Sequence, residues 1–250
     1  TFGGFNLGNF TGTAVLDGNT IHDTGGHGIW AQTSGGGLIL SDNTLYDIGG
    51  RGIQIDAAAV SVTITGNEIS NAAGYAAIVV DTGATGATIN NNNLHHNDGG
   101  GAAINAQTAA FDNNIIAFNG YGVEMGAAGA SFALHYNQIY GNDPYSTACA
   151  LYGVCHDGLS VYDGVADADR NWWGAVSGPG PVGPGAGDGI SLNVNYTYWC
   201  TNAGCTAFAP NAIVSPNTAN SPYMPWANVF EWTGVPNGTS YILQVYNAAD

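Results

Sequence analysis

The chain alternates short apolar runs with polar, glycine-rich turns, and an asparagine returns at a nearly fixed place in that pattern. Six of these asparagines have apolar residues three positions before and two positions after them, and a seventh follows. The seven are Asn19, Asn43, Asn67, Asn92, Asn114, Asn137 and Asn171. Their successive spacings are 24, 24, 25, 22, 23 and 34 residues. A period in this range predicts a stack of repeats.

A second pattern follows each asparagine, of the form small, apolar, any residue, apolar. This is the period of a strand that is buried on one face. The seven segments start at Gly28, Gly52, Ala77, Ala103, Gly122, Gly158 and Gly189. A repeat of this length cannot bury its apolar face alone, so the repeats must stack on one another.

Parallel stacking at about 4.8 Å per coil superimposes the asparagines and predicts a ladder of amide hydrogen bonds along the stack. We expect Asn67, in mid-ladder, to be buried and hydrogen-bonded to Asn43 and Asn92. Asn97 lies outside the column, so we expect it to tolerate alanine.

The seventh asparagine opens the segment Asn-Trp-Trp-Gly at 171–174, followed by Ser-Gly-Pro at 177–179 and Gly-Asp-Gly-Ile-Ser at 187–191. This segment resembles the closing coil of many bacterial extracellular β-helix proteins. Over roughly residues 11–200 the chain resembles right-handed parallel β-helix proteins of the pectate-lyase-like superfamily, although Tyr198 stands where the family usually has proline. The resemblance implies an all-β solenoid of about seven coils. It implies little about activity, because that superfamily holds lyases, hydrolases, adhesins and inert scaffolds.

Four regions are predicted along the chain. Residues 1–15 form an N-terminal strand or cap, 16–200 the β-helix, 201–225 a loop and linker, and 226–250 a β-hairpin or partial β-sandwich. The last region resembles the opening strands of a fibronectin type III-like module, which needs about 90–100 residues. We therefore expect either a fragment of a longer protein or a hairpin that completes its sheet on the β-helix or on a neighbouring subunit.

The charge of the chain limits its possible binding partners, and its cysteines indicate the cellular compartment. The chain has no lysine, only two arginines and a net charge of −16, which argues against nucleic acid and anionic membranes as partners. It contains no run of 18 apolar residues, so no transmembrane span is predicted. Two close pairs, Cys149/Cys155 and Cys200/Cys205, favour disulfides over a zinc site because the pairs lie in different coils. We expect a secreted or cell-surface protein that begins at a mature terminus after signal removal.

Candidate chemistry lies one residue beyond the buried pattern of each strand. These outward positions are Gln32, Asp56, Asp81, Gln107, Gly126, Tyr162 and Asn193. Asp56 and Asp81 fall on adjacent coils, where a separation of about 5 Å would suit a retaining glycosidase pair or a Ca²⁺ site. With Arg51 at the start of the strand and Trp30 available to stack on a sugar, these four residues are glycan-binding candidates.

No catalytic residue, metal ligand or cofactor is assigned. Polygalacturonase-like hydrolases carry an adjacent Asp-Asp and an Arg-x-Lys, and both are missing here. His135 is interpreted as a solvated turn residue. Asp163, Asp167 and Asp169 could bind Ca²⁺ near the closing coil, but acid-rich turns of secreted proteins are commonly just solvated, so no metal is placed there.

The leading functional prediction is a structural or adhesive extracellular protein, such as a self-assembling filament subunit. The alternatives are a polysaccharide lyase or glycoside hydrolase with a cleft on the β-helix, and a noncatalytic glycan-binding module. The sequence leaves open whether the protein is an enzyme, and the absence of a complete catalytic set argues against it. Candidate assembly residues are the aromatic side chains near the two ends, Phe2, Phe5, Phe10, Trp226, Phe230 and Trp232.

Overall fold

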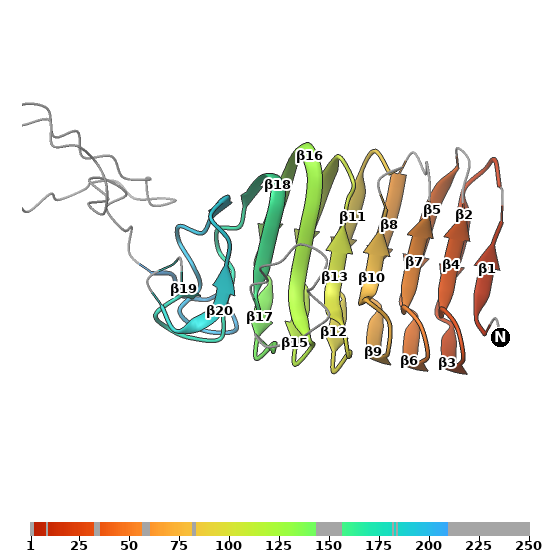
Figure 1. Cartoon of the computed structure of the whole chain (residues 1–250), viewed down its shortest axis with the longest axis horizontal. Helices are drawn as coiled ribbons and strands as arrows, with labels where there is room; N and C mark the ends of the chain where they lie inside the picture. The colour runs from red at the N-terminus through yellow and green to blue at the C-terminus, as the bar shows by residue number, and fades with distance from the viewer. Residues whose placement is uncertain are drawn as a thin grey trace, which may run out of the picture.

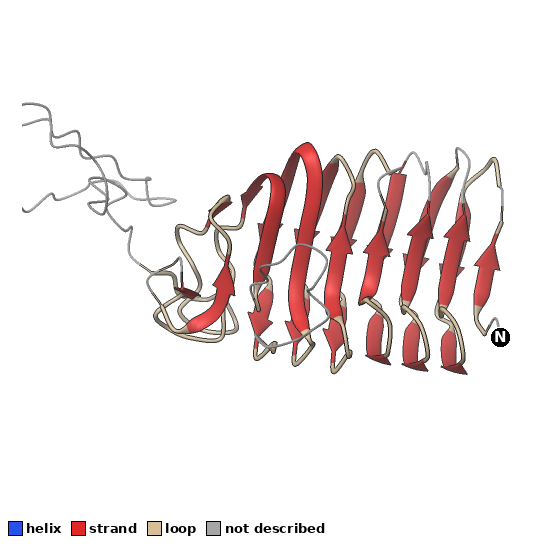
Figure 2. Ribbon diagram, viewed as in Figure 1, coloured by secondary structure: helices blue, strands red, loops and turns tan. Residues whose placement is uncertain are grey.

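The described residues form a stack of parallel β-coils (Figure 1). The computed structural model describes residues 3–8, 10–32, 36–56, 61–81, 84–143, 157–181, 183 and 185–209. None of these residues is helical (Figure 2), so this part of the chain has no helix that could cross a membrane. The prediction of an all-β solenoid of about seven coils is confirmed. The predicted linker and hairpin, from residue 210 to residue 250, lie outside the described residues.

The coils contribute strands to three faces, which we call A, B and C. Face A contains β1 (Phe5–Leu7), β4 (Ile29–Gln32), β7 (Ile53–Asp56), β10 (Ala76–Val80), β13 (Gly100–Ile104), the first parts of β16 (Tyr121–His135) and β18 (Leu159–Asp167), and β20 (Gly187–Ile190). Face B contains β2 (Ala14–Asp17), β5 (Gly37–Ser41), β8 (Ser61–Thr65), β11 (Ala87–Asn90), β14 (Thr108–Asp112), the later parts of β16 and β18, and β21 (Val194–Asn195). Face C contains β3 (Thr20–Thr24), β6 (Thr44–Ile48), β9 (Glu68–Ala72), β12 (Asn93–His95), β15 (Ile115–Ala117) and β17 (Gln138–Tyr140). The short strand β19 (Pro179–Pro181) pairs with β20.

The core consists of the inward residues of all three faces, stacked coil on coil. Successive side chains of a strand point to opposite sides, so inward and outward positions alternate, as in the pattern of β8. On face A one inward column runs through Ile29, Ile53, Ile78, Ala102, Val123 and Leu159, all fully buried. Trp173 is also fully buried and closes the core in the seventh coil.

The predicted alignment of the fifth strand of face A is wrong by two residues. The pattern aligned Ala103 with Ala77 and Gly122, whereas the structure pairs Ala103 with Val79 and Glu124. A shift of two residues keeps every side chain on its own face, so the alternation could not reveal the error. In the outward column, Asn105 therefore lies beside Asp81, where Gln107 was predicted. The backbone N–H of Asn105 donates to the carbonyl of Val80, the residue before Asp81.

The seven asparagines form a continuous ladder between faces B and C. The backbone N–H and the side-chain amide of Asn67 both donate to Oδ1 of Asn92, at 2.9 and 3.0 Å, and Asn43 donates to Asn67 in the same way. The amide of Asn67 also donates to the carbonyl of Leu40 in the preceding coil, 3.0 Å away. From Asn43 onward the ladder members are buried. Each side chain therefore satisfies turn groups that the strands leave without a partner.

The turn before each ladder asparagine bends through a left-handed residue. The positions are Gly18, Asp42, Gly66, Asn91, Asn113, Tyr136 and Arg170, with φ between 52° and 68°. Glycine, asparagine and aspartate tolerate this conformation best. This explains why turn residues of these types precede five of the seven ladder positions.

A second ladder, which the sequence analysis did not recognise, lies five residues further along three coils. Asn97 donates to Oδ1 of Asn119 at 2.8 Å, and Asn119 donates to Asn142 at 3.1 Å. Asn142 then donates to Oδ2 of Asp188 at 2.8 Å, and the carboxylate ends the ladder because it only accepts. Asn97 is 3 % exposed and belongs to a ladder, so the structure contradicts the premise on which its tolerance of alanine was expected. The same column holds Thr24, Ile48 and Ala72 in the earlier coils, so the asparagines begin only at the fourth repeat.

We predict that Asn67→Ala and Asn97→Ala each lower the free energy of unfolding by roughly 1–3 kcal/mol, because each leaves buried backbone groups without a partner. Asn6→Ala is the control, since Asn6 lies exposed on β1 and should change stability little. Chemical denaturation of the three variants measures the effect. An Asn97→Ala variant as stable as Asn6→Ala would contradict a structural role for the second ladder.

Candidate functional site

The outer surface of face A carries a connected polar network on β4, β7 and β10. The indole N–H of Trp30 donates to Oδ2 of Asp56 at 2.5 Å. The amide of Gln54 donates to Asp56 and, at 3.0 Å, to Asp81, while the guanidinium of Arg51 donates to Oε1 of Gln54. The strand register brings these residues together, since Trp30 pairs with Gln54 and Gln32 with Asp56. The four predicted glycan-binding residues thus lie in one network, with Gln54 at its centre.

The two aspartates are neighbours in this network. Burial raises the pKa of Asp81, and the neighbouring carboxyl group of Asp56 raises it further. Asp56 accepts hydrogen bonds from Trp30 and Gln54, and Asp81 accepts one from Gln54.

His27 supports the tryptophan from the preceding turn. Its Nδ1 accepts a hydrogen bond from the backbone N–H of Arg51 at 3.0 Å, and its ring meets Trp30 edge-on with centroids 5.6 Å apart. Burial, and next the charge of Arg51, lower the pKa of His27. A neutral ring with Nδ1 as acceptor is therefore the form that this arrangement favours.

A cavity of about 160 Å³ opens beside this network and extends to β16 and β18. Its polar lining consists of Arg51, Asp81, Asn105, Glu124 and the hydroxyl-bearing rings of Tyr75 and Tyr162. Glu124 is 4 % exposed, and both of its oxygens are engaged, one by the hydroxyl of Tyr75 and the other by that of Tyr162 at 3.0 Å. Burial raises the pKa of Glu124 to about 7, although the Tyr162 hydrogen bond opposes the shift.

A small apolar cluster on the outside of face A fixes one wall of this cavity. Tyr121 is fully buried there with Ala76, Val79 and Ala103, and its hydroxyl donates to the backbone carbonyl of Tyr75 at 3.0 Å. A Cβ at Gly100 would lie 2.0 Å from the Tyr121 ring, so glycine is required beneath it. The ring thereby holds Tyr75 in position to reach Glu124.

Only part of this site was predicted from the sequence. Arg51 and Asp81 were candidates, whereas Tyr75, Asn105 and Glu124 had no predicted role. The two-residue alignment error displaced Asn105 from the outward column. The available signal was Glu124 itself, a glutamate at an outward strand position that aligns with Gln54 three coils earlier.

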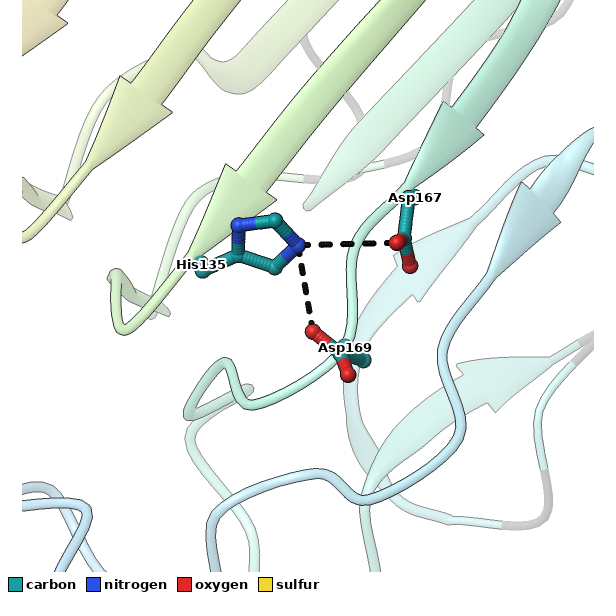
Figure 3. A group of neighbouring side chains, drawn as sticks. All are labelled: His135, Asp167 and Asp169. Carbon is teal, nitrogen blue, oxygen red and sulfur yellow. Dashed lines mark ion pairs between the residues drawn. The ribbon is translucent and has the colours of Figure 1, made fainter. Parts of the chain in front are cut away.

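A second group of polar side chains lies between faces B and C (Figure 3). His135, at the end of β16, faces Asp167, at the end of β18, and Asp169, in the turn that follows. Nε2 of His135 is 3.1 Å from Oδ1 of Asp169 and 3.6 Å from Oδ2 of Asp167. The interpretation of these residues as solvated turn residues missed this convergence, because it treated each residue within its own coil.

The remaining candidates are distributed as follows. Cys200 and Cys205 form a disulfide, whereas Cys149 and Cys155 lie outside the described residues. Phe5 is 42 % exposed on β1, and Phe10 packs against the core. The other assembly candidates, Phe2, Trp226, Phe230 and Trp232, lie outside the described residues, so self-association stays a prediction.

Stacked parallel coils with three strand faces and internal asparagine ladders define this protein as a parallel β-solenoid. The family model for the right handed beta helix region matches residues 3–168, so the chain belongs to the right-handed β-helix family. Searches among curated proteins and solved structures gave no match.

We predict that Glu124 makes stability depend on pH. Its pKa is about 7 in the folded protein against 4.5 ordinarily, so folding favours its neutral form. That contribution is complete below about pH 4.5 and is lost as the pH rises through about 7, with a magnitude on the order of 2 kcal/mol.

In Glu124→Gln, the free energy of unfolding should therefore decrease less between these two pH values than it does in the unmutated protein. Glu68→Gln is the matched control, because the side chain of Glu68 is 53 % exposed. Denaturation curves at several pH values measure the difference. A Glu124→Gln curve parallel to that of the unmutated protein would contradict a buried, neutral Glu124.

Proposed function

We propose that this protein is an extracellular, adhesive β-helix that binds a neutral polysaccharide across face A. The observation that carries the proposal is the cavity on face A, whose lining includes two carboxyl groups, Asp81 and Glu124, and two tyrosines, Tyr75 and Tyr162. The disulfide between Cys200 and Cys205 supports an oxidising, extracellular setting.

The chemistry of this surface suits a sugar. Hydroxyl groups both donate and accept, and the cavity offers carboxyl acceptors together with the amide of Asn105 and the guanidinium of Arg51. Tyrosine and tryptophan present an apolar body with a polar tip, which matches a sugar ring and its hydroxyls. Trp30 lies on the same face, two strands from Val79 in the cavity lining, so successive sugar units along the stack would meet both ends of the site.

Charge favours a neutral glycan over a uronate. Two acidic side chains, Asp56 and Asp81, stand on this face beside the single cation Arg51. The net charge of −16 adds a field that repels a polyanion. An acidic polymer would also have to place its carboxylates against these groups.

We predict that a neutral hexose or pentose polysaccharide retards the protein in affinity gel electrophoresis and that polygalacturonate does not. Trp30→Ala and Tyr162→Ala should each weaken binding at least about tenfold, since each removes a ring from the proposed contact surface. Tyr46→Ala on face C, where Tyr46 stacks on His22, is the control and should bind normally. Retardation by no polysaccharide, or equal losses in all three variants, would contradict the proposal.

A second candidate function is glycoside hydrolysis in the same cavity. Glu124 is favoured as a general acid because a carboxyl group with a pKa of about 7 keeps its proton near neutral pH. A second carboxyl, Asp81, lines the same cavity. Hydrolysis needs such a pair, one to protonate the leaving oxygen and one to act as nucleophile or base.

Release of reducing ends from a bound polysaccharide distinguishes the two candidates. If the cavity hydrolyses its ligand, Glu124→Gln should reduce turnover by at least about a hundredfold while the polysaccharide still binds. Glu68→Gln should leave turnover unchanged. Binding by the unmutated protein without reducing-end release would reject hydrolysis and leave the adhesive function in place.

A further inference from the structure

The group at His135 belongs to a column that the ladder itself creates. The residue two positions before each ladder asparagine stacks on its equivalents in neighbouring coils, and β14 pairs with β16 so that Asp112 lies beside His135. Asp169 holds the same offset before Asn171. Three consecutive coils thus present Asp112, His135 and Asp169 in a row, and Asp167 joins them from the end of β18.

Three atoms of this group converge. Nε2 of His135, one carboxylate oxygen of Asp167 and one of Asp169 all lie within 4.8 Å of one another. Two ligands at about 2.1 Å from one metal ion lie roughly 3.0–3.5 Å apart in tetrahedral or octahedral geometry. The distances from Nε2, 3.1 Å to Asp169 and 3.6 Å to Asp167, are close to that range.

Oδ1 of Asp169 provides an independent indication. This oxygen is fully buried and accepts no hydrogen bond from any described residue, although Nε2 of His135 lies 3.1 Å away. Buried polar atoms are nearly always partnered, so an oxygen in this state needs an explanation. An ion between the three side chains would supply the missing partner.

The remaining ring nitrogen of His135 and the remaining carboxylate oxygens of Asp167 and Asp169 each contact a further residue. Nδ1 of His135 lies 3.4 Å from Oδ1 of Asp112. The other oxygen of Asp167 accepts from the amide of Asn195 at 3.0 Å, and the other oxygen of Asp169 lies 3.5 Å from the guanidinium of Arg170. Metal-binding histidines and carboxylates are typically oriented by such outer contacts, including a carboxylate on the second histidine nitrogen.

We propose that His135, Asp167 and Asp169 bind a divalent transition-metal ion of the zinc or manganese type. The nitrogen ligand argues against Ca²⁺, which takes oxygen ligands. One nitrogen and two carboxylate oxygens leave at least one coordination position for water, and the side chain of Asp167 is 54 % exposed, so the ion can enter from solvent. The ion joins the end of β16 to the end of β18 and the following turn, and so it fastens the sixth coil to the seventh.

The test uses the full chain without an affinity tag, stripped with chelator and titrated with Zn²⁺, Mn²⁺ and Ca²⁺. Calorimetry and elemental analysis should give one Zn²⁺ or Mn²⁺ per chain, and thermal unfolding should shift upward as the metal is added. His135→Gln and Asp169→Asn should each weaken binding at least about tenfold and abolish the thermal shift. Circular dichroism of the stripped variants shows whether they remain folded.

His95→Gln is the matched control. The side chain of His95 is 25 % exposed and lies 3.3 Å from Glu68, while that of His135 is 24 % exposed, but no group of three ligands surrounds His95 in the described part of the chain. The control should bind the metal as the unmutated protein does. The proposal is overturned if no ion binds stoichiometrically, if His135→Gln binds Zn²⁺ unchanged, or if Ca²⁺ binds more tightly than Zn²⁺ with no effect of His135→Gln.

Discussion

A buried amide that must be satisfied is the constraint on which this fold depends. Each ladder asparagine enters the interior at a turn where the chain leaves face B, and there it meets backbone groups that no strand pairs. For the members between Asn19 and Asn171, Oδ1 accepts from the preceding coil, and the amide donates to the next asparagine and to a carbonyl behind it, as that of Asn67 does with Asn92 and Leu40. Because leaving such groups unpaired costs roughly 1–3 kcal/mol each, every coil is fixed in register against its neighbours.

That register determines what stands on the surface. Successive coils are stacked at a constant spacing. Outward residues with the same offset from the ladder asparagine therefore become neighbours, even though about two dozen residues separate them in sequence. Face A acquires its polar network in this way, with Gln54 between Asp56 and Asp81. The row of Asp112, His135 and Asp169 arises from the same rule on the other side of the turn. A β-solenoid thus builds sites from columns rather than from contiguous motifs.

The two proposed sites differ in their physical basis. The cavity at Glu124 is a place where burial keeps a carboxyl group close to neutral, surrounded by tyrosine hydroxyls that can exchange partners with a ligand. The group at His135 has its outer atoms already held and its inner atoms directed at one point. The first arrangement suits reversible recognition of a polar molecule, and the second suits a fixed ion that stabilises the stack.

The sequence by itself determined the architecture. Asparagines recur at a nearly regular spacing within an apolar frame, and each repeat can bury its apolar residues only by stacking on the next as a parallel coil. It also predicted that Arg51, Asp56 and Asp81 share a face, since alternation assigns sides. Alternation has a period of two, however, so it could not detect the slip at Ala103 or recognise Asn105 beside the cavity. Only the tertiary structure decided which columns meet. The second ladder through Asn97 and the convergence at His135 depend on the lateral register of coils and on side-chain direction, and neither quantity is encoded in the pattern of a single repeat.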